Sequence, residues 1–352
     1  MMKQKVIHLI PQDGLGGVEQ AARSLKPSKD LDIQVAFICG ESLIKNEIIR
    51  QVSGPKVKLN SPKFYLNAFK YLLKEKPDVL VSSLWRSNIV SVSYTLYRRL
   101  IARDDIQLIA FLHVSKFNRK LEWLLTKATM CLSNEIWCDS VATKDNLLKG
   151  TKFEKKSKVI SFFIGESSNC SFNKTPKKNN FVFWGRLSQQ KRVDKAIGLF
   201  KKIHNRNPKS LFYIYGPDNG ELNNLKKLVK KLDLVNSVLF MGTKEPSEYP
   251  KEALSSKFFI NTSSNEGMAI AVTEAMQLGI IPIVTPVGEI QNYCTNDENS
   301  IYFDESTIDK ILNLLNDDIS YQKMRDKAIQ YWSNKPSYSD DFNSNCLRLI
   351  RS

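Results

Sequence analysis

Short apolar runs alternate with amphipathic stretches along the chain, and turns rich in Gly, Asn, Ser and Pro separate them. The apolar runs predict buried strands at residues 6–10, 33–39, 79–84, 107–112, 135–139, 181–184, 211–215, 238–241, 258–260 and 281–285. The amphipathic stretches predict helices at 18–25, 65–73, 88–101, 141–149, 222–232, 269–278, 306–316, 319–332 and 340–350. Strands that alternate with helices are typical of parallel sheets, so the predicted fold class is α/β.

The chain is longer than one compact core usually grows, because it has 352 residues, and this length favours two domains. Residues 166–180 are polar and lack a strand or helix pattern, which is typical of a linker. We therefore predict a first domain over 1–165 that ends with the apolar stretch 159–164. A second domain is predicted to begin at 181 and to reach 335.

Two carboxylates fall within one predicted strand, turn, helix and strand unit at 258–288. Glu266 lies in the turn before the helix and Glu274 within the helix, with seven residues between them. Ligands bind to α/β sheets at such strand-to-helix turns, and the two oxygens of a carboxylate suit the paired hydroxyls of a ribose or a hexose. The alternative is that a Glu near a helix start simply complements the helix dipole.

Two bases flank another strand-to-helix turn, after the predicted strand 181–184. Arg186 and Lys191 are five residues apart and can close on one diphosphate, with Arg binding in bidentate fashion and Lys as a point charge. Cations at the start of a helix oppose its dipole, so their presence indicates an anionic ligand. A pair of surface cations beside a helix is the alternative.

The segments around these residues resemble the retaining GT-B glycosyltransferases, in particular the fourth glycosyltransferase family (glycosyl transferases group 1). The run Ser263-x-x-Glu266-Gly267-x6-Glu274-Ala275-Met276 with Gly279 and Pro282 looks like the E-x7-E signature, and Gly185-Arg186-Leu187 with Lys191 looks like G-R-L-x-x-x-K. Gly16-Gly17-x-Glu19 is similar to the GGxE loop, although Gly14, Gly16 and Gly17 do not form a dinucleotide fingerprint. Arg192 stands where glycine is usual, and Gly288-Glu289 replaces a more usual GG-x-x-E.

The resemblance implies two Rossmann-like domains that face each other across a cleft, with a C-terminal helix in 336–352 that crosses back to the first domain. It implies that the first Glu faces the donor sugar and the second holds the ribose. The expected donor-binding residues are Gly16, Gly17, Arg186, Lys191, Thr243, Glu266, Gly267, Met268, Ala269, Ile270 and Glu274. The expected catalytic residues are Glu266, Arg186, Lys191 and His113.

His113 follows the predicted strand 107–112, and its position there has two interpretations. A histidine at a strand end is often a core or capping residue. The resemblance instead implies that it lies near the donor sugar.

The net charge of +16 is uneven. Residues 1–165 hold 27 Lys and Arg against 15 Asp and Glu, whereas the remainder holds 25 against 21. Residues 116–127 interleave bases with Trp123 and Leu, which suits a membrane interface or a buried helix with solvated lysines. An anionic membrane surface is therefore a candidate partner. The chain lacks the basic and aromatic strand pattern of a single-strand binder, so no nucleic acid is expected.

Other signals exclude several classes of protein. The six cysteines include no C-x-x-C pair, so neither a zinc site nor a disulfide framework is expected. Asp30-Leu31-Asp32 is a D-x-D motif, but it precedes a strand instead of ending one, so it is discounted as a metal site. No metal or other cofactor is expected. The apolar run near the N-terminus is too short for a signal peptide and no stretch is long enough to cross a bilayer, so we expect a cytoplasmic protein, peripheral on the inner membrane face if it binds lipid.

The resemblance implies a retaining, metal-independent hexosyltransferase. Its donor would be a nucleotide diphosphate sugar, with UDP-sugar as the first candidate, carrying a hexose or N-acetylhexosamine. Its acceptor would be a saccharide or a lipid-linked saccharide in cell-surface polysaccharide synthesis, such as lipopolysaccharide or capsule. The alternatives are a GT-B nucleotide-sugar 2-epimerase and a non-catalytic nucleotide-binding protein.

Overall fold

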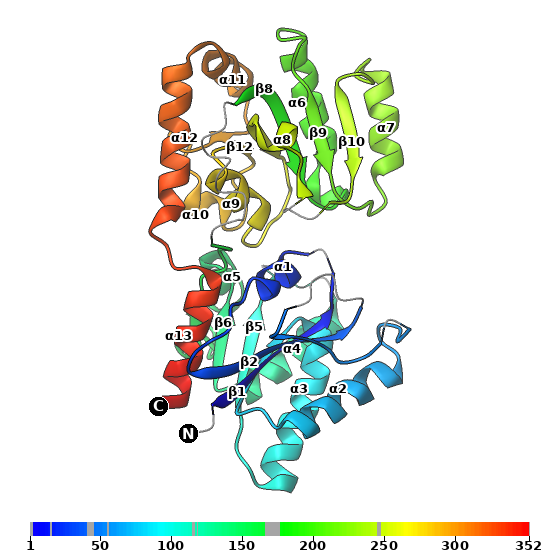
Figure 1. The fold of residues 1–352 in the computed structure, drawn as a ribbon, viewed down its shortest axis with the longest axis vertical. Coiled ribbons are helices and arrows are strands. Elements are labelled where there is room, and N and C mark those ends of the chain that lie inside the picture. The colour runs from blue at the N-terminus through cyan, green and yellow to red at the C-terminus, as the bar shows by residue number, and fades with distance from the viewer. Residues whose placement is uncertain are drawn as a thin grey trace. The chain divides into compact units, whose positions relative to one another are not determined.

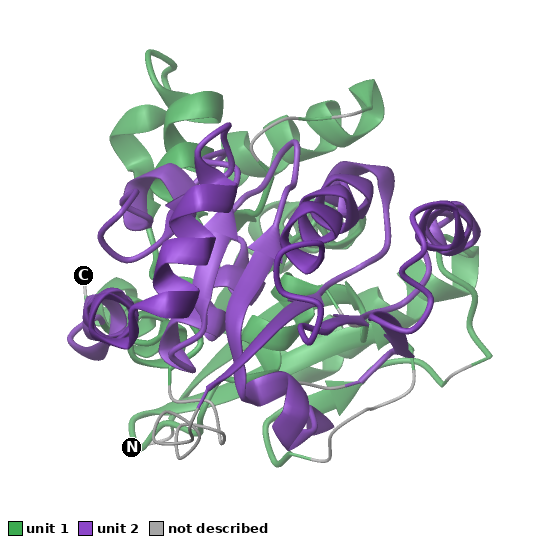
Figure 2. Ribbon diagram, turned by 90° about the horizontal axis from the view of Figure 1, so that it is seen from above, with its two compact units in different colours: residues 1–165, 336–352 green, residues 166–335 purple. Residues whose placement is uncertain are grey.

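Two parallel β-sheets form the cores of two units in the computed structural model (Figures 1 and 2). The first unit comprises residues 1–165 and 336–352, and the second comprises 166–335. The structure describes residues 3–14, 16–40, 46–54, 56–114, 117, 119–165, 177–244 and 248–351. Most of the predicted linker, residues 166–176, lies outside this range.

The first unit has a seven-stranded sheet in the order β3-β2-β1-β4-β5-β6-β7, and every neighbouring pair is parallel. Its strands are β1 (Gln4–Gln12), β2 (Leu31–Cys39), β3 (Ile49–Gln51), β4 (Val79–Ser83), β5 (Gln107–Leu112), β6 (Glu135–Cys138) and β7 (Ser157–Val159). Its helices are α1 (Gly17–Arg23), α2 (Pro62–Glu75), α3 (Trp85–Leu96), α4 (Lys120–Leu132), α5 (Val141–Leu148) and α13 (Tyr338–Arg351).

Alternate residues of β1 face opposite sides of the sheet, as the pleat of a strand requires. Ile7 and Leu9 pack with α2 and α3 in one apolar core. His8 points the other way, and its ring lies 5.5 Å from that of Phe342 on α13. The final helix therefore covers the face of the first sheet opposite α2 and α3, as the family resemblance implied.

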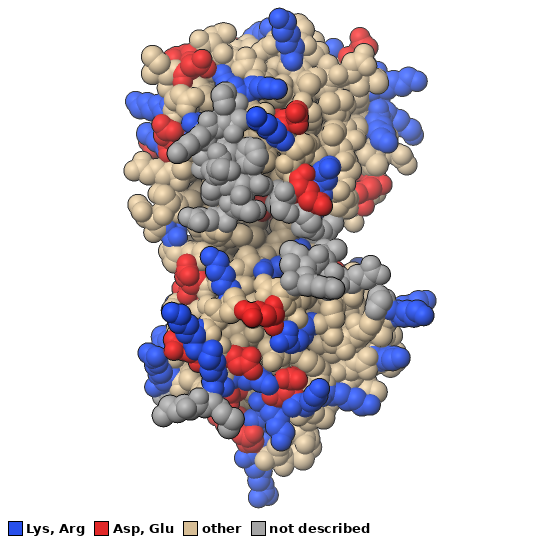
Figure 3. Space-filling view, viewed as in Figure 1, with Lys and Arg blue, Asp and Glu red and all other residues tan. Residues whose placement is uncertain are grey.

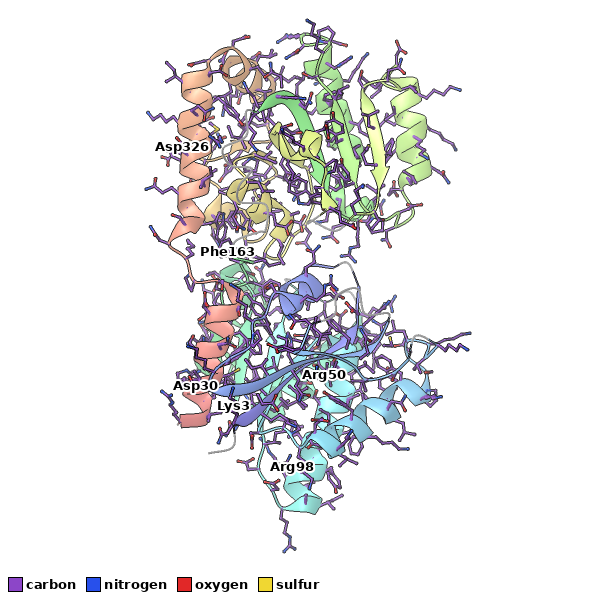
Figure 4. All side chains as sticks on the ribbon, in the orientation of Figure 1. Lys3, Asp30, Arg50, Arg98, Phe163 and Asp326 are labelled. Carbon is purple, nitrogen blue, oxygen red and sulfur yellow. The ribbon has the colours of Figure 1, made fainter. Side chains whose placement is uncertain are left out.

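Hydrogen bonds also tie α13 to the rest of the first unit. The Tyr338 N–H donates to the carbonyl of Phe163, which is labelled in Figure 4, over 2.7 Å. Asp341 accepts from the Ser161 N–H at 2.6 Å, and the Ser339 hydroxyl accepts from the Lys26 N–H at 2.9 Å. Hydrogen bonds to residues so distant in sequence anchor this C-terminal segment.

The second unit has a six-stranded sheet in the order β10-β9-β8-β11-β12-β13, again with parallel pairs only. Its strands are β8 (Lys178–Trp184), β9 (Phe212–Tyr215), β10 (Val238–Gly242), β11 (Ser256–Asn261), β12 (Ile281–Val284) and β13 (Ile301–Tyr302). Its helices are α6 (Val193–His204), α7 (Leu222–Lys231), α8 (Lys251–Leu254), α9 (Ile270–Gln277), α10 (Ile290–Tyr293), α11 (Thr307–Asn316) and α12 (Asp318–Ser333).

The order of the second sheet reverses between β8 and β11. In parallel α/β sheets, ligands bind at such a reversal point, beyond the carboxyl ends of the strands. Both segments that resemble the family signatures, 185–192 and 262–269, are the loops that follow these two strands. The sheet topology thus brings the predicted cations and the predicted acids to one place.

Two glycines let the backbone of β8 and β9 come together at this edge. Gly216 has φ +138°, and a Cβ there would overlap the carbonyl of Gly185. Gly185 itself has φ +151° and donates its N–H to the Tyr215 carbonyl at 3.0 Å. Any larger residue at Gly216 would push these two strand ends apart.

Some predicted boundaries were wrong. β8 begins at Lys178, inside the predicted linker 166–180. The helix predicted at 88–101 begins earlier, at Trp85, and its last turns are a π-helix at Tyr97–Ala102. The short strands β3 and β13 and the short helices α8 and α10 were missed, because elements of two to four residues are too short to show a period.

Candidate functional site

A buried ion pair joins the two loops at the reversal point of the second sheet. Lys191 Nζ lies 2.6 Å from Glu266 Oε1, and the two side chains are 16% and 6% exposed. The Ser263 hydroxyl lies 2.6 Å from the same oxygen, and Asn261 Nδ2 donates to it at 3.2 Å. No residue of the described ranges donates to Glu266 Oε2, so only one of the two carboxylate oxygens is occupied.

Further hydrogen bonds hold the two loops in register. The Ser264 N–H donates to the Gln190 carbonyl at 2.9 Å, and Gln190 Nε2 donates back to the Asn265 carbonyl at 2.7 Å. The Thr262 hydroxyl donates to the Arg192 carbonyl at 2.7 Å. These bonds between the loops hold Lys191 opposite Glu266 independently of the ion pair that the two side chains form.

The pKa of Glu266 is lowered although its side chain is buried. Burial works to raise this pKa, but the nearby charge of Lys191 and the hydrogen bonds from Lys191, Ser263 and Asn261 outweigh burial. Glu266 is therefore an anion at neutral pH. An ionised acid next to a cation can accept hydrogen bonds from hydroxyl groups and does not act as an acid catalyst.

Glu274 lies on α9, where its Oε2 accepts a hydrogen bond from the Trp184 indole N–H at 3.1 Å. Trp184 is the last residue of β8, directly before Gly185. Its ring packs on Phe259 and Tyr249, with centroids 4.6 and 5.1 Å away. The indole thus orients the second acid of the signature, and the sequence pattern did not identify Trp184.

The remaining predicted residues of the second unit lie in these two loops, at the start of α9 and after β10. Arg186 is exposed, and none of the described residues forms an ion pair or hydrogen bond with its side chain. Met268 and Ile270 are buried, and Ala269 between them has φ +55° at the start of α9. Thr243 follows Gly242 at the carboxyl end of β10, where it is exposed.

Both departures from the family pattern have a structural counterpart. Arg192 has φ +49°, a left-handed conformation that favours the glycine usual at this position. Gly288, with φ +59°, lies where a Cβ would overlap the carbonyl of Glu266. Gly288 is therefore required for the approach of its loop to Glu266, and the Glu289 N–H then donates to Gly267 O at 3.1 Å.

The glycine loop of the first unit is supported by a buried ion pair. Arg23 Nη1 lies 2.5 Å from Asp13 Oδ1 and donates to the Gly14 carbonyl at 2.8 Å. Gly16 caps α1, and a Cβ there would overlap the carboxylate of Glu19. Gly17 is the first residue of α1. Neither Asp13 nor Arg23 was identified from the sequence, although both flank the glycines.

His113 follows β5 as predicted, but its side chain is only 1% exposed. Its Nε2 lies 2.9 Å from the hydroxyl of Ser83. The ring packs between Phe111 and Phe162, with centroids 4.2 and 5.0 Å away. In this position the imidazole is a core group, and its contact with a donor sugar stays a prediction.

The described part of the chain, with its gaps, has neither a metal-ligand cluster nor a helix able to span a membrane. Among these residues, no group of three or more His, Cys, Asp or Glu side chains could hold a metal ion. None of the helices in the same ranges is both long and apolar enough to span a bilayer.

Comparison with known proteins associates the second unit with one family. Residues 167–334 match the family described as glycosyl transferases group 1. One component of the human phosphatidylinositol N-acetylglucosaminyltransferase is 23% identical over 170 residues, which are 47% of this chain and 34% of that protein. The uncharacterized glycosyltransferase YqgM of Bacillus subtilis (strain 168) is 24% identical over 158 residues, 44% of this chain and 43% of its own length. The chain thus matches less than half the length of either relative.

Among solved structures, that of Anabaena Alr3699/HepE in complex with UDP and glucose is similar over 99% of this chain and 100% of its own. The TM-score is 0.77 and the sequence identity is 16%. A likeness at this identity concerns the fold alone. Together with the two parallel sheets, it confirms the predicted two-domain α/β architecture.

Proposed function

We propose that this protein is a retaining glycosyltransferase. The premise is that residues 167–334 belong to the glycosyl transferases group 1 family and that the chain has the GT-B fold. Its donor is a nucleotide diphosphate sugar, with UDP-hexose or UDP-N-acetylhexosamine as the first candidates. Its acceptor is a saccharide or a lipid-linked saccharide of cell-surface polysaccharide synthesis. The second unit binds the donor.

The observation that carries this proposal is the arrangement around Glu266. Three donors, on Lys191, Ser263 and Asn261, converge on Oε1 and hold the carboxylate ionised. Its Oε2 can then accept from hydroxyls of the donor sugar. The ammonium group of Lys191, beside it, can bind a phosphate oxygen.

In this proposal the cations stabilise the leaving diphosphate. Arg186 and Lys191 neutralise the charge that develops as the bond between sugar and phosphate breaks, which requires no metal ion. The acceptor hydroxyl attacks on the side of the leaving group and loses its proton to the departing phosphate oxygen. Glu274, oriented by Trp184, holds the ribose hydroxyls.

Donor binding is tested by thermal unfolding in the presence of nucleotides and nucleotide sugars. We expect UDP and one UDP-sugar to raise the melting temperature of the wild type, because a ligand that binds only the folded state stabilises it by mass action. The Arg186→Ala variant should unfold at the wild-type temperature without ligand, since its side chain is exposed. With UDP its shift should be largely lost, because the diphosphate loses a bidentate partner.

An Arg186→Ala protein that UDP stabilises as much as wild type would remove Arg186 from the donor site. The Lys195→Ala variant is a suitable control, since it removes a cation from α6 a few residues further along the same segment. Product analysis with and without an acceptor separates transfer from the two alternatives. A 2-epimerase converts the nucleotide sugar without acceptor, and a binding protein does not consume it.

The lipid-linked acceptor is supported by the surface of the first unit. Leu121, Trp123 and Leu124 of α4 are exposed, with Trp123 at 45%, and Lys127 Nζ lies 4.6 Å from the Trp123 ring. Such a basic and aromatic helix suits the headgroup region of an anionic bilayer. Figure 3 shows Lys and Arg interspersed with Asp and Glu on the face drawn. Lys116, the first base of the predicted segment, lies outside the described residues.

Vesicles of anionic phospholipid at low ionic strength are expected to bind the wild-type protein. Replacing Leu121, Trp123 and Leu124 together by serine should weaken this binding by about tenfold or more, because apolar area and an interfacial aromatic group are lost. Co-sedimentation with vesicles measures both. The matched control is Ile319→Ser, which removes an exposed apolar side chain from the second unit and should bind as wild type. Equal binding by the triple variant would contradict the role of α4.

A further inference from the structure

A row of five polar side chains crosses the first sheet on the face that α13 covers. It consists, in spatial order, of Tyr338, His8, Ser83, His113 and Asp139, and we call it the polar row. Tyr338 Oη lies 3.4 Å from His8 Nδ1, and His8 Nε2 lies 2.7 Å from Ser83 Oγ. Ser83 Oγ lies 2.9 Å from His113 Nε2, and His113 Nδ1 lies 3.6 Å from Asp139 Oδ2.

The hydroxyl of Ser83 determines how hydrogens are arranged along the row. It has one hydrogen and lies between two imidazole nitrogens, so it donates to one ring and accepts from the other. At the far end, His113 Nδ1 is buried, has no hydrogen-bond partner among the described residues, and faces a carboxylate oxygen of Asp139. A nitrogen lone pair directed at a carboxylate would be repelled, so Nδ1 carries the hydrogen of the neutral ring.

The rest of the row follows from that assignment. Because the His113 hydrogen is on Nδ1, its Nε2 accepts from Ser83. Ser83 then accepts from the N–H of His8 Nε2, and His8 Nδ1 accepts from the hydroxyl of Tyr338. Each of the three hydrogen bonds has one donor and one acceptor.

The surroundings of the row keep its inner ring neutral. His8 is fully buried, and its ring packs against Phe111 and Phe342. Burial first, and the proximity of His113 second, lower the pKa of His8 to about 3. His8 therefore remains a neutral hydrogen-bonding group at neutral pH.

We infer that Ser83 is a positioning residue for His113. His8 holds Ser83 by a hydrogen bond, and Tyr338 holds His8 in the same way. The Ser83 hydroxyl fixes the imidazole of His113 as the Nδ1–H tautomer with that hydrogen directed at Asp139. The inference rests on the proposed function and on the expectation, implied by the family resemblance, that His113 contributes to sugar transfer. Without the hydroxyl the two tautomers of His113 approach each other in free energy, and the ring loses the bond that orients it.

The tautomer is measured directly by nitrogen NMR of the imidazole groups in the protein without substrate. The chain has three histidines, so the spectrum is simple, and the His204→Asn variant assigns the one in the second unit. In the wild type we expect a protonated Nδ1 and an unprotonated Nε2 for His113. In Ser83→Ala we expect nitrogen shifts averaged between the two tautomers, and in Ser83→Thr, which keeps the hydroxyl, shifts close to those of the wild type.

The neighbouring residue on β4 provides a matched control. Ser82 is also buried and donates its hydroxyl hydrogen bond to Asn88 on the opposite face of the sheet, at 2.8 Å. The Ser82→Ala variant therefore loses a buried hydroxyl from the same strand without touching the polar row. It should show the wild-type His113 tautomer.

Transfer kinetics provide the second measurement. We expect Ser83→Ala to lower kcat by about tenfold to a hundredfold, with the KM for the donor within about twofold, because an effect on the reacting groups appears in kcat. Ser83→Thr should recover most of the rate, and Ser82→Ala should keep it. A structural defect alone would affect Ser82→Ala and Ser83→Ala alike.

Different outcomes of the NMR and kinetic measurements contradict the inference and the proposed function. A protonated Nε2 on His113 of the wild type overturns the inference even if Ser83→Ala does not fold, and so does a wild-type tautomer in Ser83→Ala. Wild-type kcat in Ser83→Ala with an altered tautomer also overturns it, since the row would then not serve transfer. Absence of transferase activity in the wild type counts against the proposed function, while the tautomer assignment is still decided by NMR.

Discussion

Replacing Lys191 with alanine is expected to lower the rate of sugar transfer by about a thousandfold, because a preorganised cation at a developing charge is among the largest single contributions to catalysis. The same change leaves the buried carboxylate of Glu266 without its cation. Breaking one side of a buried ion pair typically costs about 3 to 5 kcal/mol of unfolding free energy. Transfer assays and chemical denaturation of the variant measure the two effects.

The pH dependence of this loss has a definite sign. In the wild type the pKa of Glu266 is lowered from 4.5, so the carboxylate contributes stability at neutral pH that is lost as the pH falls below this value. Burial is the largest single influence on this pKa and acts to raise it, while the charge and the hydrogen bond of Lys191 act to lower it. Without Lys191 we therefore expect the pKa of Glu266 to rise. The difference in unfolding free energy between wild type and Lys191→Ala should therefore shrink as the pH falls and Glu266 becomes protonated in both proteins.

The control for Lys191→Ala is Lys310→Ala in the same unit. Lys310 pairs with Asp297 at 2.8 Å on the surface, where an ion pair contributes about 0 to 1 kcal/mol. This control should retain both its stability and its rate. Wild-type turnover by Lys191→Ala would show that Lys191 does not act on the leaving diphosphate.

Replacing Glu266 with glutamine is expected to lower transfer by about a hundredfold to a thousandfold, since the variant loses an ionised acceptor for the sugar hydroxyls. The amide is nearly the same size, so the loops that Ser263 and Asn261 hold should keep their positions. Affinity for UDP should change little, because in the proposed arrangement Glu266 contacts the sugar and Glu274 contacts the nucleotide. Calorimetry with UDP and a transfer assay separate these two properties.

Glu252→Gln serves as the control for a lost surface acid in the same unit, because Glu252 lies exposed on α8. It should transfer sugar at the wild-type rate. If Glu266→Gln turned over normally, or if it lost UDP affinity as strongly as its rate, Glu266 could not be the group that faces the sugar.

Local patterns predicted most of the fold. Apolar runs such as 107–112 and 281–285 coincide with β5 and β12 to within one residue, and α9 and α11 also agree to within a residue at each end. Long or strongly apolar elements are predictable because burial on one or both faces imposes a period on the sequence. Short edge strands such as β3 bury too few residues to impose one.

The site was predictable only in part. Glu266, Lys191 and Glu274 were identified because their spacing resembles a known signature. Asn261 and Trp184 were missed because a polar or aromatic residue at the end of a strand has many possible partners. Their roles depend on which strand lies next to which.

The sequence alone therefore determined the alternation of strands and helices, the two-domain organisation and the identities of the charged groups in the family signatures. The tertiary structure decided which of these groups meet. Glu266 is 75 residues from Lys191, and the polar row joins His8 to Tyr338 over 330 positions. Such contacts follow from the strand order and from the return of α13. Local periodicity reports only how each segment is buried, and it contains no information on which distant segment supplies the neighbouring side chain.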